Sequence, residues 1–173
     1  MARLCNPRPS VRCYLDVDGV LAPYVDAGVV PSTWPDFIDG YVGSRLAVHS
    51  PAMLLALSRL ELEVVWCTTW GLQAERAFGA MLGFGARRTL DLHSTPLASG
   101  GVKGAAVLAD LQADPAPFVW IDDEAITTLA VERLESLQVP MLLIEPSRTI
   151  GLEPADVKRI DAFVRAHQHG GSR

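Results

Sequence analysis

The clearest pattern along the chain is a series of short apolar runs that alternate with longer segments of helical periodicity. The runs cover residues 11–15, 62–67, 118–121 and 139–144. Continuous apolar runs of this length are typical of strands buried on both faces, as in a parallel sheet. Because segments with helical spacing separate them, the pattern predicts a layered α/β fold with a largely parallel sheet.

The predicted helices are placed by apolar spacing and by their boundary residues. Ser50 and Pro51 are a typical N-cap and first-turn residue for a helix that runs to about Leu60. A further helix is expected to stop near Gly83 and Gly85. That helix is predicted at Leu72–Leu82. The remaining predicted helices cover Val102–Leu111, residues 124–137 and a segment from Pro154 onwards.

Three segments lie outside this regular pattern. Residues 1–10 are predicted to form a flexible N-terminal arm, and residues 168–173 a disordered tail. Residues 22–49 contain several Pro and Gly residues and four aromatic side chains, which is too broken for a helical cap domain. We therefore predict a short flap at about 22–49 within a single domain that spans 11–167.

Two aspartates follow the first predicted strand directly, in the segment Asp16-Val17-Asp18-Gly19. Residues two apart on an extended chain project to the same side, so Asp16 and Asp18 are expected to stand together. Gly19 lets the backbone turn sharply beside them. Two adjacent carboxylates suit a hard, oxygen-liganded cation such as Mg²⁺, whereas the alternative interpretation is a solvated Asp-Gly turn.

Polar residues also follow the second and third strands or open a helix. Thr68 and Thr69 come after the second strand, and Asp122 and Asp123 after the third. Lys103 opens the helical segment that begins at Val102. Ligands bind outside the carboxyl ends of the strands in open parallel sheets, so these groups are expected to meet at one edge. Hydroxyl, ammonium and carboxylate groups together suit phosphate and metal binding.

With these segments in this order, the chain resembles a member of the haloacid dehalogenase (HAD-like) superfamily of aspartate-nucleophile hydrolases. The motif Asp16-Val17-Asp18-Gly19-Val20-Leu21 carries most of the resemblance, and residues 11 to about 145 take part in it. The segment Trp66-Cys67-Thr68-Thr69-Trp70 is similar to a signature of small bacterial capless HAD-like proteins. The resemblance implies a three-layer Rossmann-like α/β sandwich with a mostly parallel central sheet and a minimal or absent cap.

The resemblance also implies catalytic roles. Asp16 would be the nucleophile that forms an aspartyl-phosphate, and Asp18 the general acid and then the general base. Thr68 would bind the transferring phosphoryl group. Thr69 is an alternative, because counting residues from the end of the strand does not exclude it. Lys103 would offset the negative charge of both nucleophile and phosphate.

The resemblance implies Mg²⁺ as the cofactor. Its ligands would be the Asp16 carboxylate, the Asp18 backbone carbonyl and an acidic residue of the Asp122-Asp123 pair. We favour Asp123 as the direct ligand, with Asp122 acting through water or through Lys103. The presence of Asp18 favours phosphate chemistry, since carbon–halogen cleavage in the dehalogenases proceeds without a second aspartate.

Three other side chains are weaker site candidates. His93 and Arg148 are placed by the pattern near the same edge, Arg148 just after a strand end. Trp70 follows Thr69, and helix packing is the favoured interpretation over a stacking role.

Composition narrows the function classes. The formal net charge is −5, and the sequence shows no basic stripe of the kind expected in a nucleic-acid binder. Charge therefore does not indicate a nucleic-acid partner. No apolar run approaches the length of a membrane helix, which predicts no membrane partner. The three cysteines, Cys5, Cys13 and Cys67, lack CxxC spacing, which favours a reduced, cytoplasmic location.

The leading hypothesis is a Mg²⁺-dependent phosphomonoesterase that acts on a phosphorylated substrate of unknown identity. A capless mouth would admit a phosphorylated protein side chain or a nucleic-acid end, and a homodimer could supply a lid from its second subunit. The alternatives are a catalytically weak phosphate- or nucleotide-binding regulatory module, and a phosphotransferase.

Overall fold

The computed structural model describes residues 11–25, 29, 31–42, 45–83, 87–94 and 101–167. The predicted N-terminal arm and C-terminal tail lie outside these residues, as do Cys5 and Gly85. None of the helices in the described ranges is long and apolar enough to cross a lipid bilayer.

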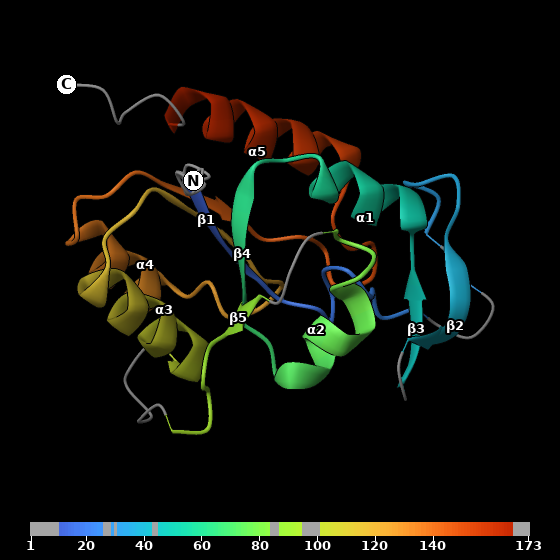
Figure 1. The fold of residues 1–173 in the computed structure, drawn as a ribbon, viewed down its shortest axis with the longest axis horizontal. Helices are drawn as coiled ribbons and strands as arrows, with labels where there is room; N and C mark the ends of the chain where they lie inside the picture. The colour runs from blue at the N-terminus through green and yellow to red at the C-terminus, as the bar shows by residue number, and fades with distance from the viewer. Residues whose placement is uncertain are drawn as a thin grey trace, which may run out of the picture.

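A five-stranded sheet with the order β5-β4-β1-β6-β7 forms the middle of the molecule (Figure 1). All of its strand pairs are parallel, so the predicted fold class is confirmed. Its strands are β1 (Val11–Leu15), β4 (Leu62–Trp66), β5 (Arg88–Thr89), β6 (Phe118–Ile121) and β7 (Met141–Ile144). The two-residue strand β5 was not predicted, because it is too short to leave a periodic pattern.

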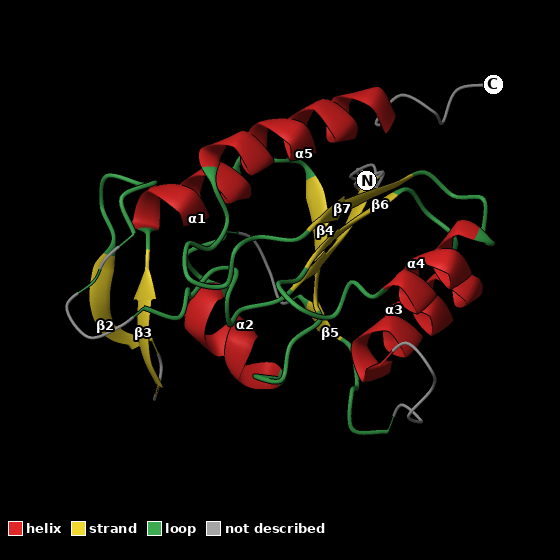
Figure 2. Cartoon of the chain, turned by 180° about the vertical axis from the view of Figure 1, so that it is seen from behind, coloured by secondary structure: helices red, strands yellow, loops and turns green. Residues whose placement is uncertain are grey.

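Helices cover both faces of the sheet, which gives the three layers seen from behind in Figure 2. The helices are α1 (Pro51–Ser58), α2 (Leu72–Phe78), α3 (Gly101–Ala113), α4 (Thr128–Glu135) and α5 (Pro154–His167). Buried side chains of α1, α2 and α5 join one core cluster, and those of α3 and α4 join the other. Ser50 caps α1 as predicted, because its side chain accepts a hydrogen bond from the Met53 backbone N–H at 3.1 Å.

Strand β1 connects the two cores because its side chains alternate between the faces of the sheet. Val11, Cys13 and Leu15 pack in the cluster with α1 and α5, whereas Tyr14 packs in the cluster with α3 and α4. All five residues of the strand are buried. The apolar run that predicted this strand therefore reflects helices on both sides.

Helices α2 and α4 differ from their predicted bounds by more than two residues. Helix α2 ends at Phe78 rather than at Leu82, with Gly79 as its C-cap. Helix α4 begins at Thr128 rather than at residue 124, because the side chain of Asp122 holds the preceding segment in a turn. A side-chain acceptor that captures backbone N–H groups competes with helix formation in this way.

The segment predicted as a short flap contains a hairpin where an irregular chain was expected. Strands β2 (Ile38–Val42) and β3 (Arg45–His49) pair antiparallel in a separate two-stranded sheet. The hairpin lies beyond α1, at the opposite end of the molecule from α3 and α4 (Figure 1). Ile38 is 46% exposed, whereas Ala47 and His49 are buried. Asp39, Gly40 and Arg45 interrupt the two strands, so the strands leave no continuous apolar run in the sequence.

Hydrogen bonds tie the chain that precedes this hairpin to the main body. Trp34 Nε1 donates to the Leu152 backbone carbonyl at 2.7 Å. Asp36 accepts from the Ser50 hydroxyl at 2.5 Å and from the Ala52 backbone N–H at 2.8 Å. The chain that leads into the hairpin is therefore anchored at the first turn of α1.

A buried arginine links β1 to α3. Arg12 is 3% exposed and donates to Asp114 Oδ2 at 2.7 Å and to Asp110 Oδ2 at 3.3 Å. The Tyr14 hydroxyl donates to the same Asp110 oxygen at 2.6 Å, and Arg88 pairs with Asp110 as well. These groups satisfy one another at the amino-terminal side of the sheet.

We expect Arg12→Ala to lower the free energy of unfolding by about 3 kcal/mol, because it removes a buried side chain and takes one of two cations from the Asp110 carboxylate, which is 15% exposed. Urea denaturation followed by circular dichroism measures the change. Arg165→Ala is the matched control, since Arg165 is 75% exposed and pairs with Asp161 within α5. That exposed pair contributes less than about 1 kcal/mol. Equal losses in the two variants would contradict the role assigned to burial.

Candidate active site

The carboxyl ends of β1, β4 and β6 bring Asp16, Thr68 and Asp122 to one edge of the sheet. Backbone bonds hold these ends in register, from Asp16 N–H to the Ile121 carbonyl at 3.1 Å and from Cys67 N–H to the Leu15 carbonyl at 2.9 Å. Asp16, Thr68 and Asp122 are all buried. Three segments that lie far apart in the sequence therefore present polar side chains to one small volume.

Lys103 joins the two buried aspartates. Its Nζ donates to Asp16 Oδ2 at 2.5 Å and to Asp122 Oδ2 at 2.8 Å. Burial opposes the charge of Lys103, but the two carboxylates outweigh burial and raise its pKa above the usual value. Lys103 is thus held as an ammonium ion between two anions, with its side chain 14% exposed.

The surroundings of Asp16 oppose its charged form. Burial and the charge of Asp122 raise the pKa of Asp16 to about 6, against the opposing effect of Lys103. One ammonium group therefore does not fully offset the carboxylates at this edge. A further cation would favour the charged form of Asp16.

Asp122 and Asp123 have different surroundings. Both oxygens of Asp122 are occupied, because Oδ2 accepts from Lys103 while Oδ1 accepts from the backbone N–H groups of Glu124 and Ala125. The Oδ2 atom of Asp123 is buried and has no hydrogen-bond partner among the described residues. Burial and Asp122 raise the pKa of Asp123. A buried carboxylate oxygen without a donor is a group that a cation would stabilise.

The three aspartates Asp16, Asp122 and Asp123 each offer a carboxylate oxygen within 4.8 Å of the others. All-oxygen donors of this kind fit a hard divalent cation such as Mg²⁺. Gly19, at φ +72°, supports the arrangement, because a Cβ atom at this position would collide with the Asp123 carboxylate. The residues present therefore fit a metal site, with Asp123 better placed than Asp122 to donate a free oxygen.

Trp70 holds the second aspartate of the motif. Its Nε1 donates to Asp18 Oδ2 at 2.9 Å, and its backbone N–H donates to the Thr68 hydroxyl at 3.3 Å. The indole is 5% exposed and lies against Phe78. Trp70 therefore packs in the core, as predicted, and also orients a site carboxylate, a contact that its position in the sequence does not indicate.

The two threonines are placed differently. Thr68 is 1% exposed, and its hydroxyl forms a hydrogen bond that favours the charged form of Asp16. Thr69 is exposed. Both line the cavity described below, but only Thr68 is linked to Asp16.

Arg148 also reaches the site from the loop after β7. Its Nε lies 3.9 Å from Asp123 Oδ2, and its guanidinium stacks on the Tyr24 ring at 4.7 Å from the centroid. The Tyr24 backbone N–H donates to the Arg148 carbonyl at 2.8 Å. Arg148 was a weak candidate, and the rule that strand ends face the ligand correctly indicated its position.

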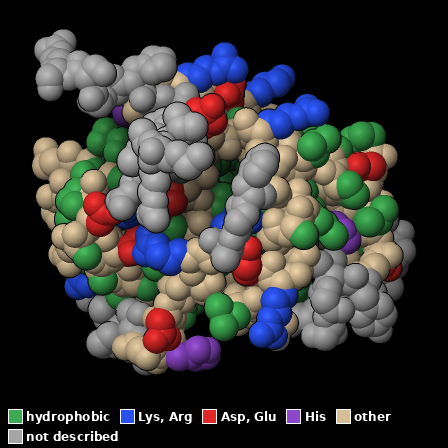
Figure 3. Space-filling model, in the orientation of Figure 1, with side chains coloured by type: hydrophobic (Ala, Val, Ile, Leu, Met, Phe, Trp, Pro, Cys, Tyr) green, Lys and Arg blue, Asp and Glu red, His purple; other side chains and the backbone are tan. Residues whose placement is uncertain are grey.

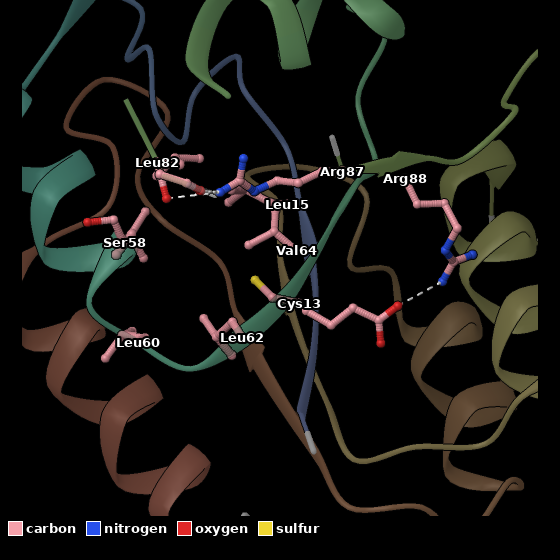
Figure 4. A pocket seen from close by; sticks show the side chains of 12 residues that line it. Cys13, Leu15, Ser58, Leu60, Leu62, Val64, Leu82, Arg87 and Arg88 are labelled. Carbon is pink, nitrogen blue, oxygen red and sulfur yellow. Dashed lines mark hydrogen bonds and ion pairs between the residues drawn. The ribbon is translucent and has the colours of Figure 1, made fainter. Parts of the chain in front are cut away.

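A cavity of about 700 Å³ opens beside Thr68 and Lys103, and residues of α2 and of the first turn of α3 line it. His93, the third weak candidate, contributes to its lining. A smaller cavity of about 320 Å³ lies over β1 and β4, with Cys13 and Val64 pointing into it (Figure 4). None of the site aspartates lines the smaller cavity, and burial raises the pKa of Cys13 to about 12. The larger cavity is lined by Thr68 and Lys103, which both contact Asp16, so it lies next to the carboxylates.

The fold and this site define a HAD-like domain of the hydrolase superfamily. The chain belongs to the family described as the HAD domain in Swiss Army Knife RNA repair proteins, whose pattern it matches over residues 12–157. The resemblance drawn from the sequence is thereby confirmed. No curated protein and no solved structure matches the chain.

We expect Mg²⁺ to raise the melting temperature of the protein, because a cation bound only to the folded state stabilises it. At a concentration tenfold above Kd the gain is about 1.4 kcal/mol, or roughly 3–5 °C. Asp123→Asn is expected to abolish this response. Differential scanning calorimetry with and without Mg²⁺ measures it.

Glu124→Gln is the matched control for that experiment, because the Glu124 side chain is 69% exposed and follows Asp123 directly. It should keep the full response. A Mg²⁺ response that survives in Asp123→Asn would remove Asp123 from the metal site.

Proposed function

We propose that this domain hydrolyses phosphomonoesters through an aspartyl-phosphate formed on Asp16. The observation that carries the proposal is the buried Asp16 carboxylate, held at 2.5 Å by Lys103 and next to the Asp123 oxygen that has no hydrogen-bond partner among the described residues. Mg²⁺, when bound by Asp16 and Asp123, would screen the charge repulsion between the nucleophile and the phosphate.

In the first step, an Asp16 oxygen attacks phosphorus while the bond from phosphorus to the ester oxygen breaks. Asp18 gives its proton to that leaving oxygen. Lys103 and the Thr68 hydroxyl hold oxygens of the phosphoryl group, so negative charge is offset where it develops.

In the second step, a water molecule attacks phosphorus and Asp18 takes the proton of that water. The bond from phosphorus to Asp16 breaks, which releases inorganic phosphate and restores the Asp16 carboxylate, while Asp18 again carries the proton that it gave up in the first step. Dividing the hydrolysis between two steps lowers each barrier, because neither step requires a free hydroxide ion.

The family description supports a phosphorylated RNA end as the substrate. The chain that leads into the hairpin β2–β3 is anchored at α1, and the described residues include no helical cap over the site. A bulky polynucleotide end could therefore approach the aspartates. Cytoplasmic location and assembly as a homodimer remain predictions from the sequence.

Long-range charge adds little to such binding. Figure 3 shows basic side chains along the upper edge of one face, over the position of α5. The exposed basic residues of α5 include Arg159 and Arg165, which pair with Asp156 and Asp161 one turn away. With a net charge of −5, the protein must hold an RNA end mainly through contacts at the site.

The direct test is Mg²⁺-dependent release of phosphate from an aryl phosphate. We expect Asp16→Asn to lower kcat by at least about a thousandfold, because the amide is not a nucleophile. Asp161→Asn, on the exposed face of α5, should keep full activity. Acid quenching during turnover should trap phosphate on the peptide that contains Asp16.

The other outcomes of this test would either contradict the proposed mechanism or support a different function. Activity that Asp16→Asn leaves unchanged would remove Asp16 as nucleophile. Mg²⁺-dependent binding of phosphate esters without turnover would support a regulatory binding module. Phosphate recovered on an added alcohol rather than on water would support a phosphotransferase.

A separate prediction concerns Trp70 as a positioning residue. Trp70→Phe keeps an aromatic ring in the core but removes the N–H that orients Asp18. We expect kcat to fall about tenfold while KM changes less than twofold, because proton transfer to the leaving group is affected rather than binding. The effect should be larger for esters with poor leaving groups than for aryl phosphates.

Trp66→Phe is the matched control. Trp66 is also buried, and its Nε1 donates to Glu75 Oε2 at 2.7 Å, away from the aspartates. It should lower stability without the dependence on the leaving group. The same kinetic change in both variants would contradict the specific role of Trp70.

A further inference from the structure

We propose that the cavity lined by α2 and the first turn of α3 binds the alcohol half of the ester, and that Leu72 and Arg76 select alcohols that carry a nucleoside. The inference rests on the proposed function and adds the residues that recognise the substrate. The cavity holds about 700 Å³, which lies within the range of small-molecule sites.

The cavity begins at the reaction centre. Thr68 and Lys103 line it, and both also contact Asp16, through the Thr68 hydroxyl and through Lys103 Nζ. A phosphoryl group held by these two residues would have the cavity beside it. The organic part of the ester is therefore directed into this cavity.

The walls of the cavity are mainly apolar. Leu90 and Leu92 come from the chain that follows β5, Val102 comes from α3, and Leu72 comes from the first turn of α2. Leu72 is 68% exposed, so a ligand seated in the cavity would cover apolar surface that water now contacts. Apolar side chains on opposite walls suit the flat faces of a ring.

Polar groups are also present along these walls. The Thr89 hydroxyl is buried, lines the cavity and has no hydrogen-bond partner within the described ranges. Gln73 adds an exposed amide. A plain hydrocarbon ring would leave these groups unsatisfied, whereas the polar edge of a nucleobase or a ribose hydroxyl would satisfy them.

Arg76 extends the cavity outward. It lies four residues after Leu72, so the two side chains share one face of α2 a turn apart. Arg76 is exposed and lines the cavity. In a polynucleotide, the phosphate next to the terminal nucleoside would meet this guanidinium, whereas a mononucleotide has no such group.

The test first measures binding without turnover. Asp16→Asn serves as the background, and quenching of tryptophan fluorescence by a nucleoside monophosphate in Mg²⁺ gives the Kd. We expect Leu72→Ser to weaken this binding about fivefold, because a ring loses part of its apolar cover. Leu55→Ser is the matched control, since Leu55 is 50% exposed on α1 and does not line the cavity.

The second measurement compares substrates in the otherwise unchanged protein. Leu72→Ser should raise KM for a nucleoside monophosphate about fivefold, whereas Leu55→Ser, outside the cavity, should leave this KM unchanged. Arg76→Gln should raise KM about tenfold for a short RNA with a terminal phosphate, but not for the mononucleotide. Arg59→Gln, at the exposed end of α1, is the control for loss of charge.

The outcomes separate this inference from the proposed function. If turnover requires Asp16 but Leu72→Ser leaves nucleotide binding unchanged, the proposed subsite is wrong. The phosphatase activity would still be supported. Binding that depends on Leu72, without turnover of any ester, would support the subsite and refute the phosphatase. Equal effects of Arg76→Gln on the mononucleotide and the RNA would overturn the assignment of Arg76 to a second phosphate.

Discussion

The rest of the site depends on one electrostatic constraint, the burial of three carboxylates beside a single ammonium group. Asp16, Asp122 and Asp123 present oxygens within 4.8 Å of one another, and Lys103 bridges two of them. Lys103 also lies in the first turn of α3, where the helix dipole disfavours a cation. The lysine is retained there because the carboxylates outweigh both burial and the dipole. An arrangement with this much local conflict is typical of a site that binds charge.

The parallel sheet offsets the electrostatic cost of this arrangement, because both faces of β1 are buried in apolar packing. Apolar packing against α1 and α5 on one side and α3 and α4 on the other secures the strand ends. Backbone bonds between the ends of β1, β4 and β6 then set the spacing of the polar groups. The carboxylates are thus held by the core rather than by one another.

The two tryptophans of the Trp66-Cys67-Thr68-Thr69-Trp70 segment illustrate how one motif serves two purposes. Each donates its indole N–H to a carboxylate, but the Trp66 partner is Glu75 on α2 and the Trp70 partner is Asp18. The first contact fastens α2 to the sheet, and the second orients a site residue. Helix α2 then forms one wall of the cavity, so packing and recognition use the same element.

The sequence alone determined the layered fold and the edge where the site would form. Apolar runs reveal strands buried on both faces, and the carboxyl ends of parallel strands meet, so Asp16, Thr68, Lys103 and Asp122 were placed together from pattern alone. The hairpin and β5 left no such pattern, because Asp39, Gly40 and Arg45 interrupt the hairpin strands and β5 has two residues.

Tertiary structure decided the finer distinctions, since each depends on distances between residues far apart in the chain. Only the fold shows that Asp122 is occupied by Lys103 and two backbone N–H groups, whereas an Asp123 oxygen lacks a hydrogen-bond donor among the described residues. The bond from Trp70 to Asp18 spans 52 positions. Spacing along a sequence sets which edge a side chain reaches, but the direction in which it points there is a property of the packed molecule.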